Sequence, residues 1–443
     1  MAAERPLNIL LLCNRPVRNA DAATVTDHLD AFGRYSRHRV RELSFLRRLP
    51  SALDLTQFDV LVIHYSIAIG YLSEHYISPA AKRRVRDFPG LKVVFIQDEY
   101  RAIDAVIEAL RFMRVDLLFT CVPDDEIEKV YPAEKLPGLA MVGNLTGYVP
   151  ERLLEIETAP IAARTIDVGY RTRKPPYWLG ELSYEKWSIS DRFEEQARSA
   201  GLRLDLSYNE ADRIYGQAWA GFMSRCKAML GVESGASVFD FDGTLQRKVD
   251  DYVAANPQAG FREVQQKFLG PYEGLIRLNQ ISPRCFECAA LGTVMVLYEG
   301  GYSGVLEPWR HYIPLHKDFS NFGEVLGVLK DNARLQEIAN RAREEIGRNP
   351  EYSFRGFIGR FDDAVDREFE RRSLDRAATP YTPGRYWLQI VFSPLYVVHR
   401  ISSGIFQYVL LGTPIRALMF GVWKRVPLNT RDAIRPLLRL IGR

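Results

Sequence analysis

Short apolar runs recur along the first 150 residues, separated by longer segments in which polar and apolar positions mix. The runs cover residues 7–13, 58–64, 91–96, 116–121 and 138–142, and each ends in polar residues or a turn. Continuous apolar runs of this length are typical of strands buried on both faces of a parallel sheet. A helix is expected to begin at about residue 22. The alternation predicts a parallel, doubly wound sheet.

The same pattern restarts after a boundary near residues 158–165. Further strands are predicted at residues 166–170, 202–206, 293–298 and 311–315, and helices at 186–200, 332–348 and 351–375. The chain is therefore predicted to be an α/β protein with two Rossmann-like, doubly wound domains that face a cleft. The domains are placed at 1–157 and 163–350, followed by a closing helix at 351–378 and a tail at 380–443.

The tail differs sharply in composition from the rest of the chain. Residues 386–399 and 401–415 are uncharged, yet each run is shorter than the roughly 20 residues of a membrane-spanning helix. Residues 385–443 carry nine basic side chains and one acidic one, Asp432, whereas the whole chain has a net charge of +4. Apolar helices with spaced arginines favour the interface of an anionic membrane. A helical hairpin packed on the body or on a second subunit is the alternative.

The remaining 384 residues carry a net charge of −4, since the tail contributes +8. A nucleic-acid-binding body would need its own basic face, so no nucleic-acid partner is expected. Five cysteines, an odd and scattered set, favour a reducing compartment. The N-terminus shows no signal-peptide pattern, so export is not expected. These features together predict a cytoplasmic protein, peripheral on the inner face of the cell membrane.

Residues 279–304 (NQISPRCFECAALGTVMVLYEGGYSG) combine a short helix, a buried strand and a glycine turn. Ser282 is expected to cap the helix, Gly292 to end it, and the strand to follow at once. Arg284 and Glu287 fall in the first turns of this helix, close to its positive end. Such groups, beside a flexible Gly-Gly backbone at the carboxyl end of a strand, suit a phosphorylated, hydroxyl-rich ligand.

The segment Phe286–Thr293 (FECAALGT) resembles the second half of a signature of GT-B glycosyltransferases, particularly family 4 ("group 1") and the related spore-coat-type domains. The resemblance implies a nucleotide-sugar donor held mainly by the C-terminal domain, with Glu287 binding the ribose hydroxyls. Asn279 stands where that family has its first glutamate.

A looser match, Gly180-x-Leu182 followed by Glu185-Lys186, resembles the family segment whose basic residues hold the donor diphosphate. The diphosphate is therefore expected to contact basic side chains and the backbone after the central strand. These candidates are Arg171, Arg173, Lys186, Arg284, Gly300, Gly301 and Tyr302. No carboxylate cluster is evident, so neither a metal nor another cofactor is expected.

His64, Asp98 and Glu99 follow predicted strands of the first domain, on the side of the cleft. One of them is predicted to act as the general base that an inverting transferase would need. The predicted function is transfer of a sugar from a nucleotide-sugar to a glycan or lipid-linked acceptor, in the synthesis of surface polysaccharides or glycoconjugates.

Two alternatives stay open. Residues 240–245 (DFDGTL) match the nucleophile motif of haloacid-dehalogenase-type phosphatases, which act through magnesium. Otherwise these residues form a structural turn or a loop lining the cleft, with Glu233 and Ser234 as polar contacts. The second alternative is a catalytically silent GT-B scaffold at the membrane. Cys285 and Cys288 are interpreted as packing residues, and Tyr215 and Trp219 as core residues rather than a platform for a base.

Overall fold

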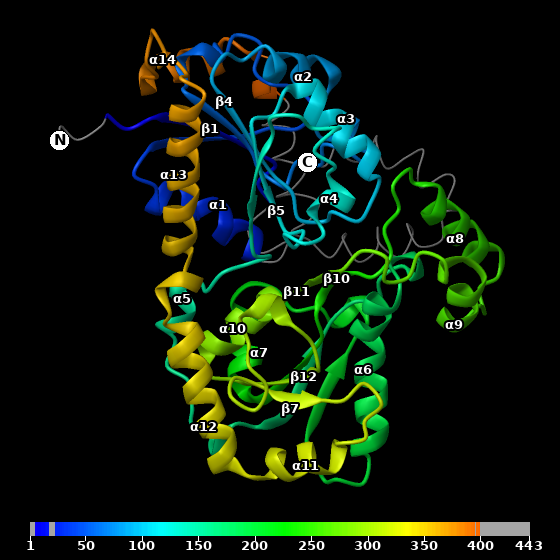
Figure 1. Ribbon diagram of the computed structural model, residues 1–443. Coiled ribbons are helices and arrows are strands. Elements are labelled where there is room, and N and C mark those ends of the chain that lie inside the picture. Colours follow the sequence, from blue (N-terminus) through cyan, green and yellow to red (C-terminus); the bar gives the residue numbers. More distant parts are fainter. Residues whose placement is uncertain (1–4, 17–22, 395, 399–443) are drawn as a thin grey trace.

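The computed structural model describes residues 5–16, 23–394 and 396–398 of the chain. It confirms an α/β protein built on two parallel sheets, one above the other in Figure 1. The first sheet has the order β2-β1-β3-β4-β5-β6, and every neighbouring pair is parallel. Its strands are β1 (Asn8–Cys13), β2 (Arg39–Ser44), β3 (Val60–Ile63), β4 (Leu91–Phe95), β5 (Leu117–Thr120) and β6 (Ala140–Gly143).

The second sheet has the order β13-β12-β9-β7-β8 and is also entirely parallel. Its strands are β7 (Ile166–Arg171), β8 (Leu204–Ser207), β9 (Cys226–Gly231), β12 (Val294–Tyr298) and β13 (Ile313–Leu315). A small antiparallel pair, β10 (Ser234–Ala236) with β11 (Leu278–Gln280), lies beside it. All nine predicted strands are confirmed. The strands β2 and β9 and the short pair β10 and β11 were not predicted.

The helices mostly connect consecutive strands, as a doubly wound fold requires. In chain order they are α1 (Ala23–Tyr35), α2 (Pro79–Arg86), α3 (Ile103–Met113), α4 (Ile127–Val130), α5 (Glu151–Leu154), α6 (Glu181–Ala197), α7 (Gly216–Arg225), α8 (Thr244–Ala255), α9 (Phe261–Val264), α10 (Pro283–Leu291), α11 (Phe322–Lys330), α12 (Asn332–Ala342), α13 (Phe354–Arg371) and α14 (Pro383–Val391).

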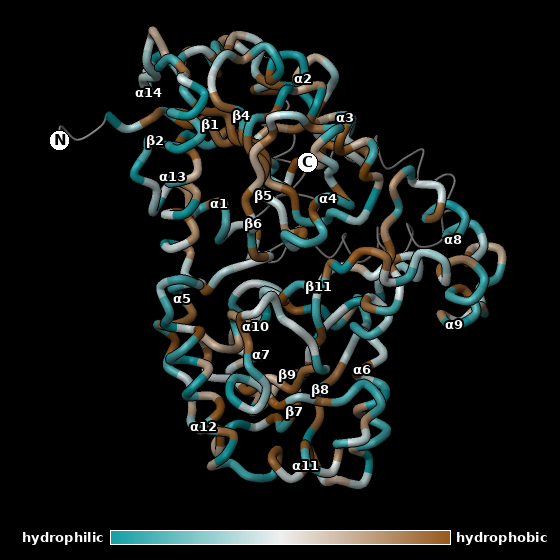
Figure 2. The backbone as a smooth tube through the Cα atoms, in the orientation of Figure 1, coloured by the Kyte–Doolittle hydropathy of each residue, from teal (hydrophilic) through white to brown (hydrophobic). Residues whose placement is uncertain are grey.

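Each sheet is covered by apolar side chains on both faces, which explains the uninterrupted apolar runs in the sequence. Within β1, residues 10 and 12 belong to one core cluster and residues 9, 11 and 13 to the other. The strands of the second sheet divide in the same way between two clusters. Figure 2 shows the hydrophobic positions gathered along these strands, with hydrophilic ones on the surrounding helices and turns.

The helix α13 returns from the second domain and packs on the first sheet (Figure 1). Its apolar stripe contributes Phe354, Phe357, Ile358, Phe361 and Val365 to a core cluster that also contains residues of β1, β3, β4 and β5. This helix occupies the segment predicted as a closing helix. The domain that begins the chain is therefore completed by residues near its end.

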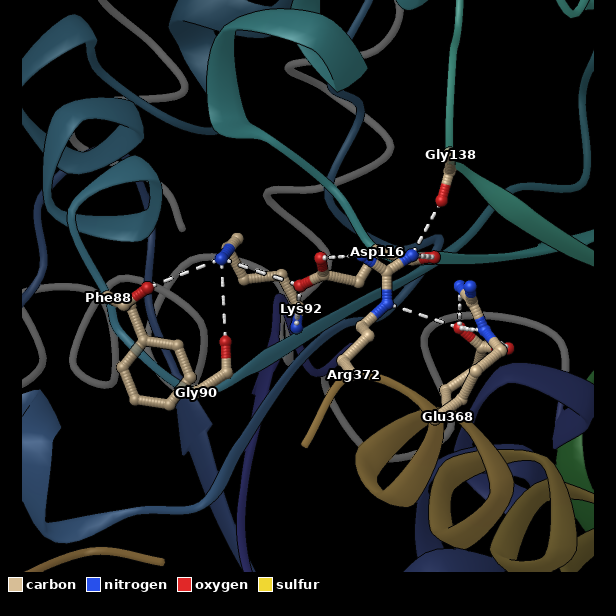
Figure 3. Close-up of polar contacts among 8 residues, drawn as sticks. Phe88, Gly90, Lys92, Asp116, Gly138, Glu368 and Arg372 are labelled. Atoms are coloured by element: carbon tan, nitrogen blue, oxygen red, sulfur yellow. Dashed lines mark hydrogen bonds and ion pairs between the residues drawn. The ribbon is translucent and has the colours of Figure 1, made fainter. Parts of the chain in front are cut away.

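A polar cluster fixes the C-terminal end of α13 to the first sheet (Figure 3). The Arg372 guanidinium lies 2.9 Å from an Asp116 carboxylate oxygen, and it donates to the backbone carbonyls of Asp116 (3.0 Å) and Gly138 (2.6 Å). It also donates to Glu368 at 3.1 Å, while the Lys92 ammonium lies 3.4 Å from Asp116 on its other side. This cluster joins α13 to β4 and to the segments that lead into β5 and β6.

The two sheets meet through the loops that follow their strands. After β4, the chain pairs with the loop of the second domain that contains Asp240: the Asp240 N–H donates to the Tyr100 carbonyl (2.9 Å), and the Ala102 N–H donates to the Asp240 carbonyl (2.6 Å). After β6, the Thr146 hydroxyl donates to the Ile281 carbonyl. The carboxyl ends of both sheets therefore face each other across the domain boundary.

Within residues 5–16, 23–394 and 396–398, no helix is long and apolar enough to cross a membrane. Most of the basic, apolar tail lies outside the described residues. Its first part forms α14, which packs on the first domain.

We expect Arg372→Ala to lower the free energy of unfolding by about 2–4 kcal/mol, because it removes the three contacts by which this guanidinium joins α13 to Asp116 and Gly138. Urea denaturation of both proteins measures this difference. The neighbouring Arg371 is half exposed and, within the described part of the chain, pairs only with Glu368. Arg371→Ala is therefore a matched control with an expected loss below about 1 kcal/mol. Equal effects of the two substitutions would contradict this account.

Candidate functional site

The helix α10 begins where the second sheet meets the first domain. The Ser282 hydroxyl accepts from the Arg284 N–H at its start, and Gly292 ends it in the left-handed conformation with φ 59°. The Arg284 guanidinium lies over the Tyr170 ring, 4.8 Å from its centroid, and donates to the Arg171 carbonyl at 2.5 Å. Its Nε is buried with no hydrogen-bond partner in the described part of the chain. Arg284 therefore keeps unused hydrogen-bonding capacity at the end of β7.

Lys186 lies within electrostatic range of two arginines, Arg284 and Arg173. Burial, with smaller contributions from the charges of Arg173 and Arg284, lowers the pKa of Lys186 to about 8. Among the described residues, neither the Arg173 guanidinium nor the Lys186 ammonium forms a hydrogen bond or an ion pair. The charges of two arginines act against that of Lys186, and such an excess of positive charge is suited to a multiply charged anion.

Asp98 approaches this cationic cluster from the first domain. It is exposed at the end of β4, accepts a hydrogen bond from the Tyr100 hydroxyl at 2.9 Å, and its charge acts against the lowering of the Lys186 pKa. Of the three residues predicted as catalytic candidates, Asp98 is the one that the structure brings to the boundary between the domains. We call Asp98, Arg173, Lys186 and Arg284 the interdomain site.

Glu287 lies one turn further along α10, almost fully buried. Its carboxylate accepts a hydrogen bond from the Trp219 indole N–H at 2.9 Å. Burial raises the pKa of Glu287, and the nearby charges of Arg284 and Arg152 act in the opposite direction. Trp219 was interpreted as a core residue, yet its indole is only partly buried and is paired with Glu287. The four-residue spacing from Tyr215 could not reveal this contact, because Tyr215 precedes α7 instead of sharing a face with it.

The backbone amides after β12 hold a carboxylate that belongs to the protein itself. The Glu233 carboxylate accepts from the Gly301 N–H at 3.0 Å, the Tyr302 N–H at 2.8 Å and the Asn279 side-chain amide at 2.7 Å. A side chain at Gly300 would lie 2.7 Å from this carboxylate, so a glycine is needed there.

This arrangement corrects two predicted donor contacts, those of the Gly301 and Tyr302 amides. The amides of Gly301 and Tyr302 are occupied by Glu233, and the Tyr302 side chain is fully buried, with its hydroxyl donating to the Tyr298 carbonyl. Asn279 is exposed and is joined to the same carboxylate. The sequence located Glu233 near the cleft, but only the folded chain shows that it fills this set of amides.

Arg171 was predicted to bind the diphosphate, and the structure does not support this. Its guanidinium donates to the carbonyls of Tyr170, Asp205 and Asp212 and pairs with the Asp205 carboxylate at 2.6 Å. Those contacts use all three of its nitrogens to hold β7 against the neighbouring β8 and the loop that follows it. Arg171 contributes to the interdomain site only through its backbone carbonyl.

Glu99 is a structural residue, contrary to its predicted role as a base. Its carboxylate is fully buried and accepts from the Thr120 hydroxyl (2.6 Å), the Cys121 N–H (2.6 Å) and the Tyr131 hydroxyl (2.8 Å). Burial raises the pKa of Glu99 to about 7. The adjacent residues Asp98 and Glu99 thus point in different directions from the end of β4, one outward and one into the core.

His64 is also buried, so the prediction of a catalytic role is not supported. Its Nδ1 accepts from the Ser66 N–H at 3.0 Å, and its Nε2 lies 3.0 Å from Nδ1 of His28. Because the first contact makes Nδ1 an acceptor, the ring must donate through Nε2 to His28. Burial lowers the pKa of both rings, that of His28 to about 3.

The DFDGT segment is a capping turn. The Asp240 carboxylate, 2% exposed, accepts from the Gly243 and Gln246 N–H groups at the start of α8, and Asp242 accepts from the N–H and hydroxyl of Thr244. Both carboxylates are therefore engaged locally, which disfavours a phosphatase nucleophile. Cys285 and Cys288 are buried among apolar residues, as expected for packing. In the part of the chain that the structure describes, no group of three or more metal-ligating side chains occurs.

No protein-family model matches the chain, and no curated protein matches its sequence. The structure is similar to an alpha-glucosyltransferase in complex with UDP, at 11% identity and a TM-score of 0.45 over 81% of this chain and all of that one. It is also similar to T4 phage BGT in complex with UDP-glucose, at 11% identity and a TM-score of 0.46, and to Anabaena HepE in complex with UDP-glucose, at 10% identity and a TM-score of 0.45. Each of these similarities covers 82% of this chain and all of the other.

The decisive observation for the fold is the pair of parallel sheets with facing carboxyl ends, joined by a C-terminal helix that returns to the first sheet. The chain has the GT-B fold. Function in a GT-B protein depends on the side chains between the domains, so it is argued below from those residues.

The buried histidine pair predicts a loss of stability in acid. The folded pKa of each ring lies below its unfolded value of 6.5, so the unfolded state binds more protons below that pH and stability falls as the pH decreases. Glu99, whose pKa is raised to about 7, has the opposite effect on the free energy of unfolding: its contribution increases as the pH falls from about 7 to 4.5. Between pH 6 and 5, the stability of the wild type should fall more steeply than that of His28→Phe/His64→Phe by about 2–3 kcal/mol per pH unit.

Urea denaturation at each pH measures the two slopes. His316→Ala, which removes an exposed ring, should leave the wild-type slope unchanged. Parallel slopes for the wild type and the double variant would show that these two rings are not neutral in the folded state.

Proposed function

We propose that the protein is a glycosyltransferase that moves a sugar from a nucleotide-sugar donor to a glycan or lipid-linked acceptor, in the synthesis of surface polysaccharides or glycoconjugates. In this proposal it works at the cytoplasmic face of a membrane, with residues 385–443 as the attachment. Neither a metal nor a nucleic acid takes part. The observation that carries the proposal is the convergence of Arg173, Lys186 and Arg284 at the carboxyl end of the second sheet, with one carboxylate opposite.

The cations supply what a departing nucleoside diphosphate needs. Its negative charge increases as the bond to the sugar breaks, and fixed positive charges stabilise that change most effectively where burial excludes water. Arg284 offers a planar guanidinium able to bind two phosphate oxygens at once. Lys186 adds a point charge, held by burial at a pKa near neutrality. Side chains therefore perform the neutralisation that a metal performs in other enzymes.

Glu287 and Trp219 are assigned to the nucleoside. A carboxylate that accepts one hydrogen bond from an indole retains lone pairs for the two ribose hydroxyls, and the adjacent indole offers a flat apolar face. Glu233 lies on the sugar side, where it orders the turn after β12 and offers a carboxylate oxygen to sugar hydroxyls. Asp98 is positioned on the opposite domain, where an acceptor hydroxyl would give up its proton.

The direct test is thermal unfolding of the purified protein with UDP, GDP, CDP and dTDP. A ligand at about 100 times its dissociation constant raises the free energy of unfolding by roughly 2.7 kcal/mol. Arg173→Ala and Arg284→Ala should each abolish the shift, whereas Lys174→Ala should not, because the Lys174 ammonium lies over the Trp187 ring, 4.2 Å from its centroid. If none of the four nucleotides stabilises the wild type, the proposal fails.

Lys186 makes donor binding dependent on pH. Its protonated form binds the diphosphate, so affinity should fall about tenfold as the pH rises from 7 to 9 through its pKa of about 8. Lys186→Arg keeps the charge throughout this range and should bind with little change in affinity. Isothermal titration at each pH measures both proteins. A pH dependence in Lys186→Arg equal to that of the wild type would exclude Lys186 as the titrating group.

Asp98→Asn should reduce the rate of sugar transfer by at least about a hundredfold while leaving donor affinity intact, as expected for loss of a general base. The rate of transfer of radiolabelled sugar to the acceptor and the affinity for the nucleotide are measured separately, which distinguishes an effect on catalysis from an effect on binding. Asp104→Asn, on an exposed carboxylate of the next helix, is the matched control. Full activity of Asp98→Asn would remove this residue from the mechanism. Nucleotide binding without transfer in the wild type, with every acceptor tried, would favour a non-catalytic scaffold.

A further inference from the structure

The helix α14 is attached to the first domain by one face with a defined rotation. Tyr386 is buried against Tyr381 and Phe58, with ring centroids 5.7 and 6.4 Å away. The Gln389 side-chain oxygen accepts from the Asp54 N–H at 3.3 Å and from the Gln57 side-chain amide at 2.7 Å.

Two more contacts fix the ends of this helix. Near its start, the Arg385 guanidinium pairs with the Asp54 carboxylate at 2.7 Å. Just after its end, the Ser393 hydroxyl accepts from the Ala52 N–H at 3.1 Å. These directional contacts determine which side chains of α14 face the protein and which face outward.

The outward face is made of large apolar side chains. Trp387, Leu388, Val391 and Phe392 are 65%, 57%, 45% and 70% exposed, and their spacing places them on one side of the helix. Isolated exposed apolar residues are ordinary, but four neighbouring ones on a fixed helix form a continuous patch of the kind that marks a binding surface. In Figure 1, α14 lies at the end of the first domain remote from the second.

The edge strand β2 carries exposed arginines, and one of them, Arg41, borders this patch. Arg39 and Arg41 are exposed, two residues apart, and form no ion pair within the described part of the chain. The Arg41 guanidinium lies 4.7 Å from the centroid of the Tyr386 ring, and it lines a cavity of about 220 Å³ together with Trp387. The acidic residue of this cavity, Glu42, is already paired with Arg15.

We infer that the α14 face, formed by Trp387, Leu388, Val391 and Phe392, inserts into the headgroup layer of an anionic phospholipid membrane, with Arg41 beside it and Arg39 on the same strand. Apolar side chains with a tryptophan suit the boundary between headgroups and acyl chains, and arginines suit the phosphates. The chain continues from this helix into residues 399–443, which carry eight basic side chains and one acidic one. Their charge complements the same surface.

This inference refines the membrane partner of the proposed function, from the tail as a whole to a face of the folded first domain. It does not depend on sugar transfer, since lipid binding is measured without donor. If the protein binds nucleotides but not lipid vesicles, only this inference is overturned. If it binds lipid vesicles but no nucleotide, only the proposed function is overturned.

The test is sedimentation of the full-length protein with vesicles of phosphatidylcholine, with or without about 30% phosphatidylglycerol. The wild type should bind the anionic vesicles, and Trp387→Glu/Phe392→Glu should bind at least tenfold more weakly. The matched control is Tyr272→Glu/Leu275→Glu, which changes two exposed apolar residues of the second domain and should bind like the wild type. Because all four side chains are exposed, folding should be preserved, and thermal unfolding checks it.

Charge reversal distinguishes the contribution of the arginines to vesicle binding from that of the apolar face. Arg39→Glu/Arg41→Glu should weaken binding to the anionic vesicles by about tenfold, whereas Arg247→Glu/Lys248→Glu on α8 should not. Unchanged binding of Trp387→Glu/Phe392→Glu would assign attachment to residues 399–443 alone and overturn the inference. A wild-type dimer that this double variant converts to a monomer, without any loss of vesicle binding, would also overturn it and identify the face as a contact between two copies.

Discussion

Both sheets are entirely parallel, and this single constraint organises the protein. Parallel strands place all of their carboxyl ends on one edge, so the loops that carry polar side chains collect there. Two such edges face each other, joined by the pairing of residues 100–102 with Asp240 and by the return of α13 to the first sheet. Asp98 from one domain therefore lies within electrostatic range of Lys186 from the other, although the two are far apart in the sequence.

Some polar side chains at and around the interdomain site have hydrogen-bond or charge partners within the protein, and others do not. Glu99, Arg171 and Asp240 have their polar atoms matched by the protein, as buried or structural groups require. Arg173 and the Lys186 ammonium have no such partners among the described residues, and Arg284 keeps a buried Nε without one. The charges of the two arginines act against that of Lys186, an unfavourable interaction that a bound anion would relieve. The proposed nucleoside diphosphate provides that charge at the place where ligands of α/β proteins bind.

Glu233 lies beside the proposed donor site and occupies backbone amides there. It fills the amides of Gly301 and Tyr302 with a carboxylate of the protein, while Asn279 stands at the place of a glutamate in the resembling family. The carboxylate at this corner of the site thus comes from the segment after β9 and not from β11. The turn after β12 is ordered before any ligand arrives, which reduces the entropy that donor binding must overcome.

The fold class could be predicted without the structure, because strands buried on both faces must be apolar throughout, and that signal is local. The sequence did not reveal β2, whose charged residues face outward at the sheet edge, or β9. It also identified Arg284, Glu287, Lys186 and Asp98 as polar residues at strand or helix ends. Which of those side chains are accessible between the domains depends on the tertiary structure. Asp98 and Glu99 are neighbours with the same chemistry, yet one faces the second domain and the other is enclosed by Thr120 and Tyr131. Burial and hydrogen-bond partners depend on segments distant in the chain, so no local pattern could have separated them.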